Sequence, residues 1–266
     1  MRPKKRLGQH FLIDKNVVRK IISAASIEKG DCVIEVGPGT GVLTEALLEK
    51  GASVVAIEID RELCRKLRER FEGAENLELM EGDALKKDFT SLSRRRGKKF
   101  KVVSNLPYNI SGPILVKFME ERGAFSALTL MLQKEVAVRL VALPSTKDYG
   151  ILSVFARAYA IVRREFDVSP NSFRPRPRVV STVVSLDMLP KALVRPEDEG
   201  FFKKVVKSAF GKRRKTLFNA LKSLNISNAD MARALSLSGI DPERRGETLS
   251  VEEFIRLTEG FLFPAP

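Results

Sequence analysis

Cysteine is scarce in this sequence, since Cys32 and Cys64 are the only two among 266 residues. Two cysteines are too few for a disulfide framework or a structural zinc site, so we predict no metal centre. Cys32 falls in an apolar run and Cys64 in a stretch of helical spacing. Both are therefore predicted to be packing residues.

Long apolar runs are also absent, because no stretch approaches the roughly 20 residues needed to span a membrane. The basic residues 1–6 (MRPKKR) are followed by Gly8, Gln9 and His10, where a signal peptide would have its apolar segment. We therefore expect a cytoplasmic protein with no membrane partner, and a monomer.

Acidic residues are outnumbered, with 33 Asp and Glu against 47 Lys and Arg and a net charge of +14. This excess favours nucleic acid or an anionic membrane as a partner. It is concentrated at the N-terminus, at 94–101 (RRRGKKFK) and at 212–215 (KRRK). One such cluster is as readily a solvated surface, but three favour a polyanion. We predict that Arg213, Arg214 and Lys215 bind RNA.

Strand and helix patterns alternate over the first two-thirds of the chain. Apolar runs typical of strands lie at 33–36, 54–57, 77–80, 101–104 and 128–132. Such alternation predicts an α/β domain with a parallel sheet and helices on both faces. Two further β-rich runs, 160–168 and 179–187, predict an antiparallel hairpin at the sheet edge.

The pattern changes around Pro190, after which only helices are predicted. They cover 198–210, 212–223, 228–236 and 250–260. We therefore predict two domains: a catalytic, cofactor-binding domain of residues 1–189 and a small all-helical, RNA-binding domain of residues 190–266.

The turn after the first strand is rich in glycine, because residues 35–41 read EVGPGTG. Glycine lets the backbone approach a ligand closely. The spacing differs from the dinucleotide-binding G-x-G-x-x-G, and Glu35 precedes the first glycine by two positions. A carboxylate there suits the cationic amino-acid end of S-adenosylmethionine better than a pyrophosphate. We predict S-adenosylmethionine as the cofactor, with Gly37 and Gly39 in its site.

Two acidic residues farther along extend this site. Glu58 closes the second strand, where a carboxylate can accept hydrogen bonds from both ribose hydroxyls. The alternative, an exposed strand-end charge, is less favoured because of the glycine-rich loop upstream. Asp83, followed by Ala84, ends the third strand and either accepts from the adenine amino group or is a turn residue. Asp60 is expected to cap the next helix.

The fourth strand is followed by residues 105–108 (NLPY), which suit the methylation of an aromatic amine. The lone pair of adenine N6 is delocalised into the ring, so a pair of hydrogen-bond acceptors helps more than a general base. The Asn105 oxygen and a backbone carbonyl held by Pro107 supply them and direct the lone pair at the methyl group. Tyr108 would stack on the target base once that base has been flipped out from between its neighbours.

These motifs together closely resemble the KsgA-type ribosomal RNA adenine dimethyltransferases, which are related to the Erm resistance methyltransferases. The resemblance runs nearly end to end, over the segments 7–12 (LGQHFL), 35–41, 82–84 (GDA), 105–111 (NLPYNIS), 133–137 (QKEVA) and 173–181 (FRPRPRVVS). It implies a class I S-adenosylmethionine-dependent methyltransferase fold, Rossmann-like with a mainly parallel seven-stranded sheet, and a small helical C-terminal domain.

The resemblance also implies residue roles and a reaction. His10 and Leu12 would line the cofactor pocket, and Phe173 would stack on the target base opposite Tyr108. His10 is the only histidine, but the family motif tolerates Asn there, so it is not expected to be a catalytic base. The implied reaction is dimethylation of N6 of two adjacent adenosines in the 3′-terminal hairpin of 16S ribosomal RNA, within an immature 30S subunit.

Three other functions fit parts of the sequence. An Erm-type enzyme would modify one adenosine of large-subunit RNA, but Leu106 and the 173–181 run fit the KsgA type better. A DNA adenine methyltransferase would more often show Asp-Pro-Pro-Tyr at 105–108. A ribosome-assembly factor with secondary methylation stays open, because Asn105 and Glu58 indicate catalysis without excluding a binding role.

Overall fold

The computed structural model describes residues 8–212 and 214–262. The contacts of the chain divide it into two compact units, one ending at 137 and resuming over 161–188, the other made of 138–160 and the residues from 189 onward. The segment 138–160 thus groups with the C-terminal helices. The predicted domains, 1–189 and 190–266, stay a prediction.

A seven-stranded sheet forms the centre of the first unit, with the order β4-β3-β2-β5-β6-β9-β7. Its first five strands in that order run parallel, and β9 is antiparallel to β6, so the predicted fold class is confirmed. The strands are β2 (Cys32–Val36), β3 (Ser53–Glu58), β4 (Leu77–Glu81), β5 (Phe100–Asn105), β6 (Phe125–Gln133), β7 (Ala160–Val168) and β9 (Ser181–Met188).

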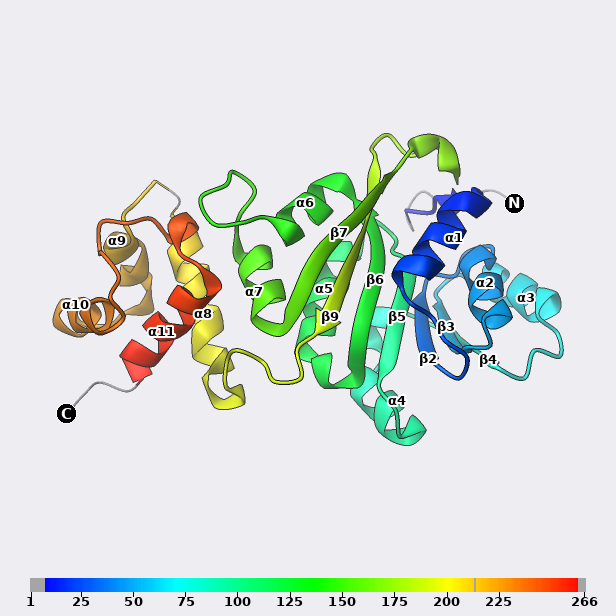
Figure 1. Cartoon of the computed structure of the whole chain (residues 1–266), viewed down its shortest axis with the longest axis horizontal. Helices are drawn as coiled ribbons and strands as arrows, with labels where there is room; N and C mark the ends of the chain where they lie inside the picture. The colour runs from blue at the N-terminus through cyan, green and yellow to red at the C-terminus, as the bar shows by residue number, and fades with distance from the viewer. Residues whose placement is uncertain (1–7, 213, 263–266) are drawn as a thin grey trace. The chain divides into compact units, whose positions relative to one another are not determined.

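Helices cover both faces of this sheet, as the alternating pattern predicts (Figure 1). Apolar residues of the first two helices share one core cluster with Val33, Val54 and Val103 of the sheet. On the other face, the rings of Phe89, Phe118 and Phe125 pack together. The helices of this unit are α1 (Lys15–Ala24), α2 (Val42–Glu49), α3 (Arg61–Arg70), α4 (Phe89–Arg96), α5 (Ser111–Glu120) and the start of α6 (Lys134–Val141).

The order of the strands creates a switch point between β2 and β5. The chain passes from β2 to β3 on one side and returns to β5 on the other. Ligands of open α/β sheets bind at such a point, in the crevice beyond the carboxyl ends of the strands. β2, β3 and β5 end there at Val36, Glu58 and Asn105.

A second, two-stranded sheet joins distant parts of the chain. β1 (Phe11–Leu12) pairs antiparallel with β8 (Phe173–Arg174), with Leu12 opposite Phe173. The Ile13 amide extends the pairing by donating to the Ser172 carbonyl at 2.9 Å. This pairing holds the N-terminal segment beside the sheet, and no local pattern in the sequence predicted it.

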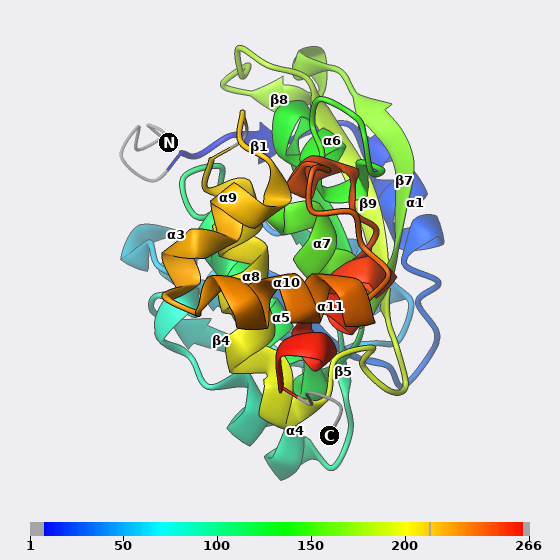
Figure 2. The ribbon, with the colours of Figure 1, turned by 90° about the vertical axis from the view of Figure 1, so that its left-hand side faces the viewer.

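The second unit is helical (Figure 2). Its core includes Phe202 and Phe254. Its helices are α7 (Ile151–Tyr159), α8 (Glu199–Phe210), α9 (Leu217–Leu221), α10 (Asn228–Leu237) and α11 (Val251–Leu262). The prediction of a helix over 212–223 is wrong at its start: Thr216 is extended and α9 begins only after it.

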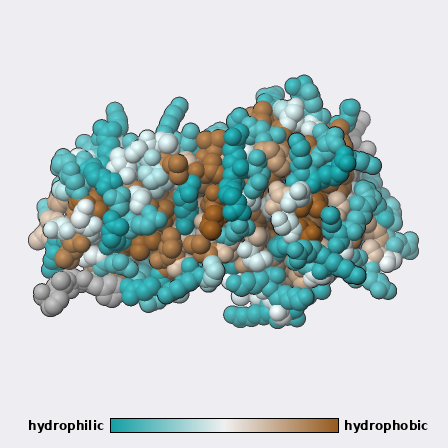
Figure 3. Space-filling model, in the orientation of Figure 1, coloured by the Kyte–Doolittle hydropathy of each residue, from teal (hydrophilic) through white to brown (hydrophobic). Residues whose placement is uncertain are grey.

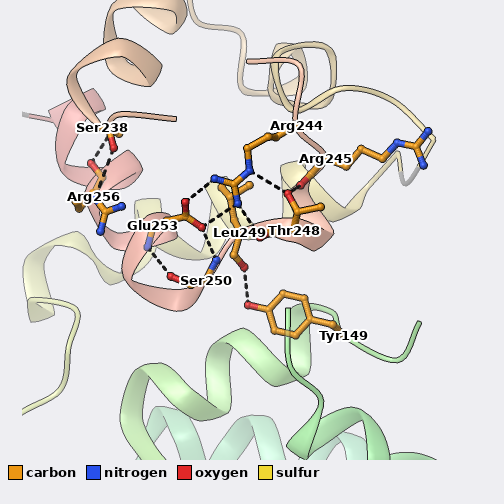
Figure 4. A network of polar contacts seen from close by, with 9 residues as sticks. All are labelled: Tyr149, Ser238, Arg244, Arg245, Thr248, Leu249, Ser250, Glu253 and Arg256. Carbon is orange, nitrogen blue, oxygen red and sulfur yellow. Dashed lines mark hydrogen bonds and ion pairs between the residues drawn. The ribbon is translucent and has the colours of Figure 1, made fainter. Parts of the chain in front are cut away.

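A polar network stiffens the second unit around Arg244 (Figure 4). The Arg244 guanidinium bonds both carboxylate oxygens of Glu253 and the Thr248 carbonyl. Glu253 also accepts from the Ser250 amide, at 2.8 Å. The buried Tyr149 hydroxyl donates to the Leu249 carbonyl at 2.9 Å. Residues 149 and 244–253 are therefore tied together by polar contacts as well as by packing.

Candidate active site

A pocket of about 300 Å³ opens at the carboxyl ends of the central strands. Its lining consists of five segments, 8–12, 35–40, 57–59, 82–84 and 105–110, together with Val42, Leu43 and Leu63. These segments contain all of the predicted cofactor residues, His10, Leu12, Gly37, Gly39, Glu58, Asp83, Ala84 and Asn105, and three of the four predicted catalytic ones, Asn105, Pro107 and Tyr108. Residues separated by as many as 100 positions in the sequence therefore meet around one cavity.

The glycine loop can adopt its path only because positions 37 and 39 carry no side chain. Gly37 and Gly39 both have positive φ, +69° and +59°, a region that other residues rarely adopt. A Cβ on Gly39 would lie 2.9 Å from the Phe11 ring, and one on Gly37 would lie 3.1 Å from Pro107. The loop is thus packed closely against the N-terminal segment and against the 105–108 motif.

Glu58 is the acidic group at the end of β3, and only 5% of it is exposed. Its carboxylate accepts from the backbone amides of Asp60, at 2.9 Å, and Gly39, at 3.3 Å. Burial raises the pKa of Glu58 above its usual value. A buried carboxylate held by two backbone amides and facing a cavity fits the role of accepting from ribose hydroxyls.

Asp60 caps α3, as expected, by accepting from the Glu62 amide at 3.1 Å. Its other carboxylate oxygen accepts from the Gln9 side chain at 3.0 Å. Gln9 thereby ties the N-terminal segment to the end of β3. Its place beside His10 in the segment 7–12 is the only signal for it in the sequence, which predicts no role for Gln9.

Glu35 lies on the pocket wall and is almost completely buried. Its carboxyl group is bonded by the Thr44 hydroxyl at 2.6 Å. Burial raises the pKa of Glu35 to about 8, and the nearby Glu58 adds to the rise. Without a bound cation, Glu35 is therefore mostly protonated at neutral pH, a state that the sequence pattern did not predict.

Asp83 and Ala84 begin the short 3₁₀ turn η2 (Ala84–Lys86) beside the pocket. One Asp83 oxygen caps this turn by accepting from the Leu85 amide at 2.9 Å. Asp83 thus acts as a turn residue and lines the cavity as well, so the two alternative readings of the sequence are compatible.

Asn105 ends β5 and points its amide group toward the N-terminal segment. Its Nδ2 donates to the His10 carbonyl at 3.1 Å. The neighbouring Ser104 hydroxyl donates to the Val36 carbonyl at 2.6 Å, and the Leu106 amide to the Met131 carbonyl at 3.2 Å. These bonds fix the start of the 105–108 motif against β2 and β6, and the bond to His10 sets which way the Asn105 oxygen faces.

The Tyr108 ring lies on the pocket wall beside His10, with ring centroids 5.4 Å apart and planes at 33°. The Tyr108 hydroxyl lies 2.6 Å from the Ser181 hydroxyl, and burial raises the pKa of Tyr108. His10 Nδ1 donates to the Pro175 carbonyl at 2.8 Å. Ser181 is a residue whose role went unpredicted, although it ends the 173–181 run.

The remaining predicted residues lie outside the pocket. Phe173 is 2% exposed and packs in the core cluster that contains Leu12, so its ring would have to leave the core to stack on a base. Arg214 and Lys215 are exposed in the second unit. Arg213 lies outside the described residues.

Family comparisons agree with this geometry. The family model described as "Ribosomal RNA adenine dimethylase" matches residues 1–261. The chain is 48% identical over 255 residues to "Ribosomal RNA small subunit methyltransferase A" of Clostridium botulinum, covering 96% of this chain and 92% of that one. A relative of the same name from Geobacter metallireducens is 46% identical over 265 residues, covering 98% and 96%.

Solved structures show the same fold. A dimethyladenosine transferase from Plasmodium falciparum aligns with a TM-score of 0.78 and 30% identity, over 93% of this chain and 96% of that one. The 23S rRNA methyltransferase ErmE aligns with a TM-score of 0.73 at 24% identity, over 94% and 99%, which shows a shared fold alone. Matched along nearly its whole length by sequence and by structure, the chain belongs to the ribosomal RNA adenine dimethylase family.

Proposed function

We propose that this chain transfers methyl groups from S-adenosylmethionine to N6 of two adjacent adenosines in the 3′-terminal hairpin of 16S ribosomal RNA. The observation that carries the proposal is the position of Asn105. Its side chain ends β5 at the pocket, and its Nδ2 is already occupied by the His10 carbonyl. This bond orients the amide group, and its oxygen, the acceptor of the group, is the atom that takes a hydrogen bond from the substrate amine.

The second acceptor for N6 is a backbone carbonyl of the same motif. The Pro107 carbonyl already accepts from the Ile110 amide at 3.1 Å. The preceding carbonyl, that of Leu106, joins the Pro107 ring and has its direction set by that ring. With the Asn105 oxygen it forms a pair of acceptors, which positions the lone pair of N6 without removing a proton in advance.

The cofactor supplies a methyl group on a positively charged sulfur. Glu58 holds the ribose, Asp83 accepts from the adenine amino group, and Gly37 and Gly39 allow close approach of the cofactor to the loop. A cation beside Glu35 favours its ionised form, so binding of the charged cofactor and loss of the Glu35 proton are expected to be coupled.

The target base stacks on Tyr108, whose ring is steadied by the hydroxyl–hydroxyl contact with Ser181. Phe173 would contribute a second stacking surface only after its ring leaves the core cluster that it shares with Leu12. Arg213, Arg214 and Lys215 bind phosphates outside the pocket.

We further propose that the substrate is the immature 30S subunit, that the enzyme acts as a monomer, and that it works in the cytoplasm, where bacterial subunits assemble. Within the described residues no helix has the length and apolar character of a membrane span. The test is to incubate immature small subunits with labelled cofactor and to map the methylated adenosines by mass spectrometry. Methylation confined to large-subunit RNA, or a single methyl per adenosine, would contradict the proposal.

A further inference from the structure

An exposed group of cations lies at the end of α4 and in the turn that follows it. It consists of Arg94, Arg95, Lys98 and Lys99, which we call the α4 patch, and all four are exposed. The surface over the end of α4, at the bottom of the view, is hydrophilic (Figure 3). The roles assigned to the pocket and to residues 213–215 leave these four charges without a function.

Neighbouring cations of the same segment have acidic partners. Arg96 pairs with Glu78, and Lys101 pairs with Asp31 at 2.8 Å. Among the residues that the structure describes, no ion pair involves a member of the α4 patch. The patch is therefore a local excess of four positive charges within six consecutive residues, 94–99.

The helix dipole accounts for only part of this excess. Cations in the last turn of a helix are stabilised by the dipole, which suits Arg94 and Arg95. The effect falls off beyond the helix end, and Lys98 and Lys99 come after Gly97, which ends α4 in the left-handed conformation. Lys98 forms no ion pair but helps to lower the pKa of the Asp31 carboxyl, while Lys99 is left without a local structural reason to be basic.

The turn that carries the two lysines is held in place. The Ser93 hydroxyl donates to the Lys98 carbonyl at 2.9 Å, and Phe100, directly after the lysines, is buried at the start of β5. The backbone under the patch is thereby anchored to α4 on one side and to the sheet on the other. Charges on an anchored backbone lose less conformational entropy on binding than charges on a free loop.

The α4 patch lies at the opposite end of β5 from the catalytic motif. β5 runs from Phe100, beside the patch, to Asn105 in the pocket. A strand rising about 3.3 Å per residue covers roughly 16 Å over these six residues. Figure 1 shows α4 and the N-terminal segment at opposite ends of the sheet. The single nucleotide whose base occupies the pocket therefore does not reach the patch.

We propose that the α4 patch binds phosphates of a segment of small-subunit ribosomal RNA different from the one that enters the pocket. This rests on the proposed function, because it takes the structured subunit as the substrate. A polyanion suits a cluster of unpaired cations. An anionic membrane suits it less, since interfacial binding combines charge with apolar side chains, and no large exposed apolar residue lies within the described segment 88–101.

The test compares wild type with a variant carrying Arg94→Gln, Arg95→Gln, Lys98→Gln and Lys99→Gln. A charge-matched control carries Lys15→Gln, Arg19→Gln, Arg65→Gln and Lys66→Gln, four exposed positions on α1 and α3. Binding of each protein to immature small subunits is measured over a range of salt concentrations. We expect the patch variant to lose about 2–4 units of the salt slope, with a Kd at least about tenfold weaker than that of the control.

Two further measurements, cofactor affinity and photo-crosslinking, distinguish a misfolded variant or a protein contact from a lost RNA contact. Affinity for S-adenosylmethionine should be unchanged in the patch variant, which also shows that the protein is folded. A photo-crosslinker at position 98 should label ribosomal RNA outside the target hairpin, and labelling of ribosomal protein alone would overturn the proposal. Equal losses in variant and control would likewise overturn it, as net charge alone would then drive binding. If wild type does not dimethylate the subunit at all, the proposed function fails instead.

Discussion

The Asn105 side chain donates to the His10 carbonyl at 3.1 Å, across 95 residues of sequence. This bond links the catalytic motif to the N-terminal segment, which is in turn tied to Asp60 through Gln9. The Asn105 amide is therefore oriented by the N-terminal segment, 95 residues away in the sequence. The orientation of Asn105 and the position of residues 8–12 should change together.

Replacing Asn105 with alanine should abolish most turnover. Losing one preorganised partner of this kind costs roughly 10²–10³ in rate. If the oxygen is needed in both rounds, the remaining product should contain little dimethyladenosine, as mass spectrometry of digested RNA will reveal. Asn76→Ala is the control, because Asn76 also donates to a backbone carbonyl, that of Ala52 at 2.9 Å, far from the pocket. Dimethylation at near wild-type rate in Asn105→Ala would make Asn105 a turn residue.

Replacing Glu58 with alanine should weaken S-adenosylmethionine binding by about 1.5–3 kcal/mol, the scale of charged hydrogen bonds. Titration calorimetry measures the change. Glu62→Ala, which removes an exposed carboxylate four residues along, should bind the cofactor as wild type does. An unchanged affinity in Glu58→Ala would remove Glu58 from the cofactor site.

Glu35 predicts a pH-dependent stability of the cofactor-free protein. Its pKa is about 8 when folded and close to 4.5 when unfolded, because burial disfavours the charge. The contribution of this group to stability is therefore complete below pH 4.5. It falls as the pH rises from there and is gone once the pH has passed about 8. The loss is on the order of 1 kcal/mol per pH unit in that window. Glu35→Gln should flatten the dependence.

Denaturant unfolding of wild type and Glu35→Gln at pH 6, 7 and 9, without cofactor, measures this effect. The variant should gain relative stability as pH rises. A constant difference between the two proteins across this range would mean that Glu35 is ionised in the folded state.

Much of the site carried a local signal in the sequence, and the rest did not. Residues 35–41, Glu58 and 105–108 lie at the carboxyl ends of strands, and those ends of parallel strands meet at one edge of the sheet. Pairs such as Tyr108 with Ser181 depend on where distant strands come to lie. The same holds for Phe173, whose burial follows from its pairing with Leu12, and for the grouping of 138–160 with the C-terminal helices.

Neutralising Arg213, Arg214 and Lys215 together should lower the salt slope of RNA binding by about two to three units, if each contacts a phosphate. The slope is read from binding curves at several salt concentrations. The control is a charge-matched variant in which three other lysines of the same unit are neutralised: Lys203 and Lys204, on α8, and Lys222. The same slope in wild type and variant would mean that residues 213–215 are a solvated surface and do not contact RNA phosphates.

Arg244→Gln should destabilise the protein by about 1–3 kcal/mol, because it leaves the partly buried Glu253 without its main partner. The bond from Arg244 is the largest cause of the lowered pKa of Glu253. The stability from this pair is present above the usual carboxyl pKa and is lost as pH falls through the lowered one. Unfolding at pH 7 and pH 3 should show the difference shrinking in acid.

The exposed pair of Arg233 with Asp230 provides the control, since both side chains are about half exposed. Surface pairs contribute about 0–1 kcal/mol, so Arg233→Gln should change stability little. Similar losses from the two substitutions would show that the network around Arg244 adds nothing beyond a surface ion pair.

The β1–β8 pair has a consequence for the order in which the protein becomes functional during synthesis. His10 and Pro175, joined by a hydrogen bond, are 165 residues apart. At roughly 5–20 residues per second, the ribosome needs about ten to thirty seconds to make what lies between them. Until then the N-terminal segment lacks its partner strand, and the cofactor pocket lacks a secured wall. A nascent chain is thus unable to hold cofactor firmly until most of its catalytic sheet has emerged.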